Sequence, residues 1–115
     1  FECIHMVNED ESGKVLAYLR LFDLEKVQDA RHRYIPGAWT FGRVAVHPDA
    51  RGTGLGRKLL HAALEWIRDN TDAKEIVIAA QAYLKDTYYS PEGFVERGEH
   101  YMESGIEHVE MVLKL

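Results

Sequence analysis

The segment Arg51–Arg57 carries glycines at three alternate positions and lies between an apolar run and the clearest amphipathic pattern in the chain. Glycine has no Cβ, so a glycine-rich backbone can approach a ligand closely. The first turn of a following helix leaves N–H groups unpaired and carries positive dipole character. These groups suit a phosphate or pyrophosphate, and the side chains of Arg51, Arg57 and Lys58 add positive charge around them. The segment therefore predicts an anion-binding turn.

The glycine spacing separates this turn from two common phosphate loops. A Walker A loop has the pattern G-x-x-x-x-G-K-[ST], but here Arg57 follows Gly56 and Leu59 follows Lys58. The dinucleotide fingerprint is G-x-G-x-x-G, whereas these glycines read G-x-G-x-G. The alternative is a glycine-rich connection that binds no ligand. Each glycine loses more backbone entropy on folding than other residues do, so three glycines next to three cations would be costly without a binding role.

The elements expected on either side of the turn predict one α/β domain on a mixed sheet. A helix is predicted over Gly54–Asn70, because apolar residues recur there at three- and four-residue spacing: Leu55, Leu59, Leu60, Ala63, Leu64 and Ile67. A short helix is predicted over Leu84–Tyr89 and an exposed loop over Leu24–Gly37. Strands are predicted over Cys3–Val7, Lys14–Phe22, Trp39–Val46, Ile76–Ala80, Phe94–Met102 and Val109–Leu115, the last two forming a hairpin that turns at residues 103–105.

Length and composition exclude several classes of protein. The 115 residues suit a single domain and exclude a two-domain enzyme. The net charge of −5, from 14 Lys and Arg against 19 Asp and Glu, argues against a nucleic-acid binder with a broad basic face. The single cysteine, Cys3, cannot form an internal disulfide, which favours a reducing, cytoplasmic setting. No apolar run approaches the roughly 20 residues of a spanning helix, and no two histidines stand at i, i+4 ligand spacing, so neither a membrane nor a metal is an expected partner.

Two ordered motifs resemble those of the GNAT N-acetyltransferases. The run Arg51–Gly56 reads R-x-x-G-x-G and follows a V-A-V strand end at 44–46, which looks like motif A of that superfamily. The later run with Gln81, Leu84, a tyrosine and then Gly93-Phe94 resembles its motif B. Three shorter segments look like the ElaA-like branch, namely FGRV at 41–44, QAYL at 81–84 and GIEH at 105–108. The resemblance extends over nearly the whole chain.

The resemblance implies a cleft for acetyl-CoA between two splayed parallel strands, Trp39–Val46 and Ile76–Ala80. The pantetheine arm would pair with main-chain atoms of Val44 and Val46, and the Val46 N–H would donate to the thioester carbonyl. A bulge near Ala45 would leave that N–H unpaired. The pyrophosphate would lie on the amides of the turn, and the implied cofactor-binding residues are Val44, Ala45, Val46, Arg51, Gly52, Thr53, Gly54, Leu55, Gly56, Arg57 and Gln81.

GNAT proteins use a tyrosine on the short helix as the acid that protonates the leaving thiolate, and two tyrosines here fit that role. Counting forward from Gln81 selects Tyr88, whereas counting back from Gly93 selects Tyr89. A one-residue insertion in the turn Ser90–Glu92 would preserve the helix phase and favour Tyr88. In a third interpretation both tyrosines simply pack in the core.

The general base is not evident from the sequence. Many GNAT proteins carry a glutamate on the strand before motif A, but this strand contains Arg43 and no carboxylate, and Arg20 is expected on the neighbouring strand. Two inward arginines would suit a substrate with a carboxylate or phosphate, unless each pairs with an acid or reaches solvent. His5 and His108 are the titratable candidates for proton removal, although a lone histidine on a strand is more often structural.

The predicted function is direct transfer of an acetyl group from acetyl-CoA to an amine. The alternatives are a non-catalytic acyl-CoA-binding module and a generic phosphate- or nucleotide-binding domain. The expected acceptor is a small-molecule or peptide amine, and a homodimer stays open. GNAT domains usually begin with a strand and one or two helices before the hairpin that starts here at Cys3, so the resemblance implies that residues 1–115 form one such domain without its first elements.

Overall fold

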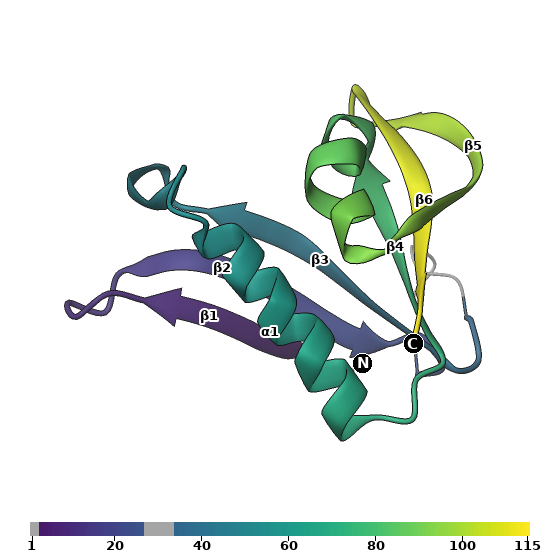
Figure 1. The fold of residues 1–115 in the computed structure, drawn as a ribbon, viewed down its shortest axis with the longest axis horizontal. Helices are drawn as coiled ribbons and strands as arrows, with labels where there is room; N and C mark the ends of the chain where they lie inside the picture. Colours follow the sequence, from purple (N-terminus) through teal and green to yellow (C-terminus); the bar gives the residue numbers. More distant parts are fainter. Residues whose placement is uncertain (1–2, 27–33) are drawn as a thin grey trace.

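The computed structural model describes residues 3–26 and 34–115, which form a six-stranded sheet with a long helix over part of one face (Figure 1). The strands lie in the order β1-β2-β3-β4-β6-β5, and among these described strands only β3 and β4 pair in parallel. The prediction of a mixed α/β sheet is confirmed. The strand bounds are β1 Ile4–Glu9, β2 Val15–Asp23, β3 Ala38–Val46, β4 Glu75–Gln81, β5 Val95–Glu103 and β6 Ile106–Lys114.

The helix α1 (Leu55–Asn70) forms where the apolar spacing predicts it. Its stripe is buried against the β1–β3 half of the sheet, apart from Leu55, which is half-buried: Leu59, Leu60, Ala63, Leu64 and Ile67. Trp66 of α1 packs against Trp39 of β3, with ring centroids 5.6 Å apart. Since each fully buried leucine contributes roughly 1.5–3 kcal/mol, this stripe fixes α1 and the turn that precedes it.

The parallel strands β3 and β4 pair only where they begin. Ala38 lies opposite Glu75 and Trp39 opposite Ile76, and no further pair follows. Beyond these residues the strands diverge, so β1–β3 with α1 form one half of the molecule and β4–β6 form the other (Figure 1). The splayed pair is the one implied by the sequence resemblance.

A β-bulge lies in β3 where it diverges from β4. Tyr18 of β2 faces Ala45 and Arg20 faces Gly42, so two residues of β3, Arg43 and Val44, stand opposite one residue of β2. Arg43 has φ +54°, in the left-handed region that residues other than glycine rarely adopt. The bulge therefore lies near Ala45, as predicted, and directly precedes it, because Ala45 itself stays in register with β2.

Three short helical turns replace the predicted helix between β4 and β5. They are η2 (Ala82–Leu84), η3 (Lys85–Tyr89) and η4 (Ser90–Glu92). The turn η3 is π-helical, and a π turn takes up one residue more than an α turn. An extra residue is thus accommodated within η3, upstream of the insertion that the sequence places at Ser90–Glu92. The segment ends at Gly93, whose φ of +101° and close approach to Leu113 both favour glycine.

The remaining predictions differ from the structure mainly at element ends. The strand β1 begins one residue later and ends two residues later than the predicted Cys3–Val7, whereas the β5–β6 hairpin turns at Ser104 and Gly105 as predicted, both with positive φ. The prediction of an exposed loop over 24–37 is wrong at Leu24, which is buried against Phe22 in a second apolar cluster on the other face of the sheet. Residues 27–33 of that segment lie outside the described residues.

Candidate active site

The turn between β3 and α1 presents a group of unpaired backbone N–H groups. Gly52 and Gly54 both have φ +81°, which favours glycine, and Gly54 is the N-cap of α1 without a capping side chain. Within residues 3–26 and 34–115, the N–H groups of Gly52, Gly54, Gly56 and Arg57 have no hydrogen-bond acceptor. Four free donors at a helix N-terminus suit a bound pyrophosphate.

Thr53 and Leu55 fix the shape of the turn. The Thr53 hydroxyl donates to the Ala50 carbonyl and accepts a weak hydrogen bond, 3.4 Å long, from the Leu55 N–H. These bonds stay inside the turn, so they leave the glycine amides available to a ligand.

The third glycine lies where α1 approaches β3 and the helical turns. A Cβ at Gly56 would lie 3.0 Å from Cγ2 of Val46, so a larger residue would force one of the two to move. The Tyr88 hydroxyl donates a hydrogen bond of 2.8 Å to the Gly56 carbonyl. Gly56 therefore brings together the end of β3, the start of α1 and a predicted catalytic tyrosine.

The backbone of Val46 is directed away from β2. The N–H of the next residue, His47, donates to the Leu16 carbonyl of β2 over 2.7 Å. Because hydrogen-bonded and non-bonded residues alternate along an antiparallel pair, the N–H and carbonyl of Val46 face the opposite direction. The carbonyl accepts a bond of 3.4 Å from Nε of Arg51, whereas the N–H faces the space that the departing β4 leaves open.

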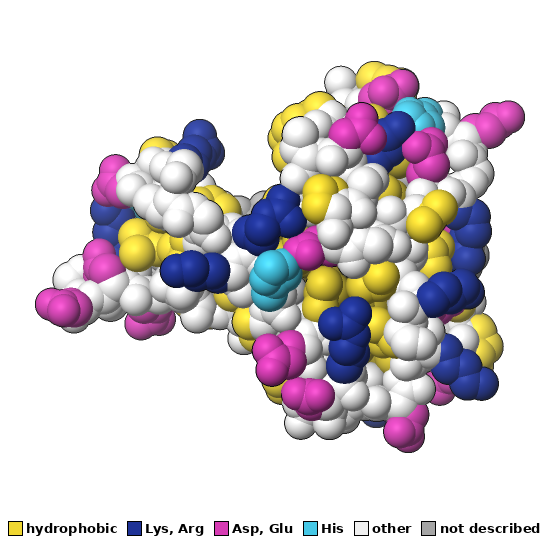
Figure 2. Space-filling view, viewed as in Figure 1, with side chains coloured by type: hydrophobic (Ala, Val, Ile, Leu, Met, Phe, Trp, Pro, Cys, Tyr) yellow, Lys and Arg dark blue, Asp and Glu magenta, His cyan; other side chains and the backbone are white. Residues whose placement is uncertain are grey.

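A cavity of about 720 Å³ occupies that space, and we call it the cofactor-side cavity. Figure 2 shows the corresponding hollow between the two halves, with Lys and Arg side chains gathered beside it despite the net charge of −5. Its lining includes five predicted cofactor residues, Val44, Ala45, Val46, Arg51 and Gln81, and both candidate tyrosines. The structure thus brings these predicted residues together from β3, the turn, β4 and η3.

The two tyrosines differ in exposure and surroundings. Tyr88 is half-buried, and this burial raises the pKa of its hydroxyl above its ordinary value near 10, partly opposed by the charge of Arg57. Tyr89 is buried, packs edge-on against Phe94 at 5.9 Å, and has a pKa raised further by burial. Of the two, only Tyr88 is hydrogen-bonded to Gly56 in the described residues.

The Arg57 side chain turns away from the predicted phosphate position and contacts the segment that carries Tyr88. Its guanidinium donates to the carbonyls of Thr87 (2.6 Å) and Tyr88 (3.4 Å), and its Cζ lies 5.4 Å from the Tyr88 ring centroid. It also pairs with the largely buried carboxylate of Glu92 at 3.3 Å, and His61 bonds the same carboxylate. We call these contacts the Arg57 clasp. Sequence reasoning missed Glu92 and His61, although the i, i+4 spacing of Arg57 and His61 places both on one face of α1.

A second cavity, of about 640 Å³, adjoins the first, and we call it the acceptor-side cavity. The two cavities share lining residues where β3 and β4 diverge: Phe41, Gly42, Arg43, Ile78 and Ala79. Arg20 of β2 and Arg43 of the bulge, both predicted to bind substrate, line this second cavity. A molecule entering it would meet the cofactor-side cavity at the divergence of the strands.

The two predicted histidines lie in different places. His5 lines neither cavity and accepts or donates a bond of 2.6 Å with the Tyr18 hydroxyl. His108 is nearly buried, lines the cofactor-side cavity, and bonds the Ile106 carbonyl through Nδ1 at 2.8 Å. The described residues include no cluster of three or more side chains suited to a metal ion.

Comparison with known proteins shows the family to which the chain belongs. The model described as "Acetyltransferase (GNAT) domain" matches residues 24–115, which is most of the chain. The chain belongs to the GNAT acetyltransferase family. A UPF0039 protein of Schizosaccharomyces pombe is 38% identical over 115 residues, which are 99% of this chain and 69% of that protein. Protein ElaA of Escherichia coli is 30% identical over 105 residues, so this GNAT protein is ElaA-like.

Solved structures agree with the fold of this GNAT protein. An acyl-CoA N-acyltransferase from Pseudomonas aeruginosa superposes with a TM-score of 0.78 at 36% identity, over 98% of this chain and 69% of that one. Escherichia coli ElaA gives a TM-score of 0.81 at 24% identity, over 99% and 69% of the two chains. The chain spans 60% of the ElaA sequence that it matches. None of the helices described is long and apolar enough to cross a membrane.

Proposed function

We propose that this GNAT protein is an N-acetyltransferase that moves an acetyl group from acetyl-CoA to an amine. The observation that carries the proposal is the Val46 N–H, which has no partner among the described strands and faces the cavity that Tyr88 also lines. The net reaction forms a C–N bond, breaks a C–S bond and moves one proton from nitrogen to sulfur. It needs no further reactant.

The glycine turn and β3 would hold the cofactor. The free amides of Gly52, Gly54, Gly56 and Arg57 suit the pyrophosphate, and the outward backbone of β3 suits the pantetheine amides. The residues present therefore fit acetyl-CoA, which supplies an acetyl thioester whose carbonyl carbon an amine can attack. Gln81 and Arg51 line the same cavity and would contact the arm and the phosphates.

Two groups of this chain would assist the chemistry. The Val46 N–H would donate to the oxygen on which negative charge develops, an effect worth about 3 kcal/mol for one well-placed donor. The Tyr88 hydroxyl would give its proton to the departing sulfur, and its raised pKa keeps it protonated at neutral pH. We assign the acid to Tyr88 rather than Tyr89 because only Tyr88 is hydrogen-bonded beside the glycine turn among the described residues.

The amine would enter through the acceptor-side cavity and reach the thioester where the two cavities meet. Arg20 and Arg43 line this route and would bind an anionic group of the acceptor. His108 lines the cofactor-side cavity and is the better placed of the two histidines to receive the amine proton. His5 is assigned no step, because its ring lies outside both cavities.

The test is release of free CoA thiol from acetyl-CoA over a panel of amines, together with calorimetry against acetyl-CoA, ATP and NAD. We expect binding of acetyl-CoA alone and turnover of at least one amine. Tight binding without turnover on any amine would support the alternative, a non-catalytic acyl-CoA-binding module, which the lack of a carboxylate on β3 favours. Preferential binding of ATP or NAD would contradict both functions.

A further inference from the structure

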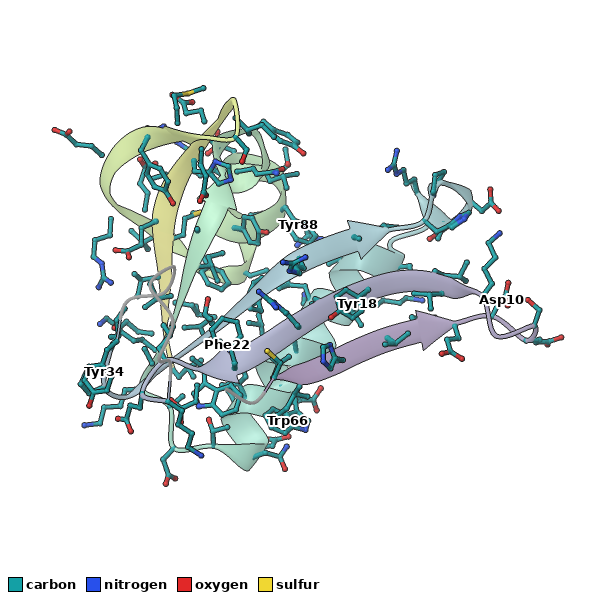
Figure 3. The ribbon with its side chains drawn as sticks, turned by 180° about the vertical axis from the view of Figure 1, so that it is seen from behind. Asp10, Tyr18, Phe22, Tyr34, Trp66 and Tyr88 are labelled. Carbon is teal, nitrogen blue, oxygen red and sulfur yellow. The ribbon has the colours of Figure 1, made fainter. Side chains whose placement is uncertain are left out.

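The acceptor-side cavity has one basic wall. Arg20 lies on β2 directly opposite Gly42 of β3, and Arg43 follows on the bulge. Gly42 carries no side chain, and a Cβ there would meet nothing within 4 Å, so the space beside Gly42 is open. Figure 3 shows this face of the sheet, with Tyr18 and Phe22 of the same strand directed toward the viewer.

Neither arginine of this wall has an acidic partner among the described residues. Nε of Arg20 is buried and makes no hydrogen bond, and its guanidinium lies 5.6 Å from the Phe22 ring centroid. Arg43 is held at φ +54° and makes no ion pair in the described part of the chain. A buried guanidinium donor without an acceptor is unfavourable, and strained backbone of this kind collects at binding sites. The unpaired Nε of Arg20 therefore suits an anionic group supplied by a ligand, and Arg43, whose side chain is exposed, lines the same cavity.

The opposite wall of the same cavity is acidic. Glu110 of β6 lies directly across from Ala79 of β4, one of the residues that both cavities share. Glu103 lines the cavity from the end of β5. Glu110 also accepts a hydrogen bond of 2.8 Å from Nε of Arg97, and Glu103 lies 3.9 Å from Nε2 of His108.

We propose that the acceptor is a small zwitterion, a free amino acid, whose carboxylate binds Arg20 and Arg43 while its ammonium group approaches Glu110. This assignment rests on the proposed acetyl transfer and adds the chemical class of the acceptor. The basic and acidic walls both line the acceptor-side cavity, next to the residues that it shares with the cofactor-side cavity, so a bound molecule with both charges would meet side chains of opposite charge there. A simple alkylamine would leave the two guanidinium groups unpaired, and a polyamine would meet them with like charge.

The experiment compares acceptors that differ only in the carboxylate: leucine, leucinamide and 3-methylbutan-1-amine, each at equal concentration of neutral amine. A panel of the other free amino acids and their amides follows the same design. We expect kcat/KM for the acid to exceed that for its amide and its decarboxylated amine by at least about tenfold, as for loss of a charged partner. Free CoA thiol and the acetylated product are both measured.

Substitutions test whether Arg20 causes the preference for acids over amides. Arg20→Gln should bring the acid-to-amide ratio of kcat/KM near one, and Arg20→Lys should restore part of it because the charge is kept. Arg68→Gln, an exposed arginine of α1 outside both cavities, is the matched control and should keep the wild-type ratio. Unchanged affinity for acetyl-CoA in each variant shows that the protein is folded.

The outcomes separate the two proposals. Turnover of amides and alkylamines as fast as acids, or an Arg20→Gln variant with the wild-type ratio, would overturn the zwitterion and leave acetyl transfer intact. Absence of turnover on every amine, with acetyl-CoA bound, would overturn acetyl transfer and the zwitterion with it. A preference for the acids that disappears in Arg20→Gln supports both.

Discussion

The two adjoining cavities are built in different ways. The cofactor-side cavity takes its donors from backbone, namely the amides of the glycine turn and the outward face of β3 at Val46. The acceptor-side cavity takes its charges from side chains on β2, the β3 bulge, β5 and β6. A backbone site depends on conformation and on the absence of Cβ atoms, whereas a side-chain site depends on which strands the topology brings together.

This difference predicts different responses to substitution. Changing a glycine of the turn alters conformation and space at once, while changing a cation beside the turn removes only one charge near several remaining donors. On the acceptor side, removing a single cation should have the larger effect, because Arg20 and Arg43 supply the positive charge of its basic wall. The following experiments test the contrast.

The largest effect is expected for Gly54→Glu. The residue adopts φ +81° at the N-cap of α1, so glutamate there strains the backbone and adds negative charge where the pyrophosphate would bind. Affinity for CoA, measured by calorimetry, should fall by at least about 100-fold, or about 2.7 kcal/mol. Retained affinity would mean that the cofactor binds elsewhere.

Two controls separate conformation from charge in that result. Gly13→Glu places the same residue at φ +88° in the β1–β2 hairpin, outside both cavities, and should leave CoA affinity unchanged. Arg51→Gln removes a cation from the lining of the cofactor-side cavity and keeps every backbone donor, so we expect a loss of only about threefold. An Arg51→Gln loss as large as that of Gly54→Glu would contradict a site built from backbone.

Tyr88→Phe should lower kcat by about 100-fold, because the thiolate loses its proton donor, while the KM for acetyl-CoA changes little. Tyr89→Phe is the matched control, since Tyr89 is the buried neighbour that packs against Phe94. Steady-state kinetics at saturating acceptor would measure both. Loss of kcat in Tyr89→Phe but not in Tyr88→Phe would move the acid to the second tyrosine.

Arg57→Gln should lower kcat by about tenfold, with a smaller effect on CoA affinity. The substitution breaks the Arg57 clasp, which holds the carbonyls of Thr87 and Tyr88 and the carboxylate of Glu92. Arg57→Lys, which keeps the charge but not the planar fork, should recover part of the rate. A larger loss in CoA affinity than in kcat would place Arg57 in phosphate binding instead.

The smallest effect is expected in the alkaline arm of the pH profile. The acid acts while protonated, and burial raises the pKa of Tyr88, so kcat should not decline through Tyr88 ionisation between pH 7 and its ordinary pKa of about 10. Arg57 lowers that pKa, so Arg57→Gln should move the alkaline decline to higher pH. A wild-type decline near pH 8 that disappears in Tyr88→Phe would contradict this assignment.

The sequence predicted the cofactor-side cavity better than the acceptor-side cavity, because the first is built from a local backbone segment and the second from side chains on distant strands. Glycine spacing in Arg51–Arg57 and the apolar stripe of α1 are local patterns, so the turn and helix could be located before the fold was known. The placement of Glu110 across from Ala79 depends on the order of β4, β6 and β5, which no local pattern encodes. The Arg57 clasp joins residues 35 positions apart and was equally inaccessible to sequence reasoning.

The brief pairing of β3 with β4 leaves most of the facing edges of both strands without a neighbour among the described strands. An extended ligand with amide groups, inserted there, would act as a missing strand and join two half-sheets that otherwise meet at one end. Cofactor binding would then stiffen the whole molecule rather than fill a hole in its surface. Ligand at 100 times its Kd stabilises a folded protein by about 2.7 kcal/mol, and here that energy would act across the seam between the two halves.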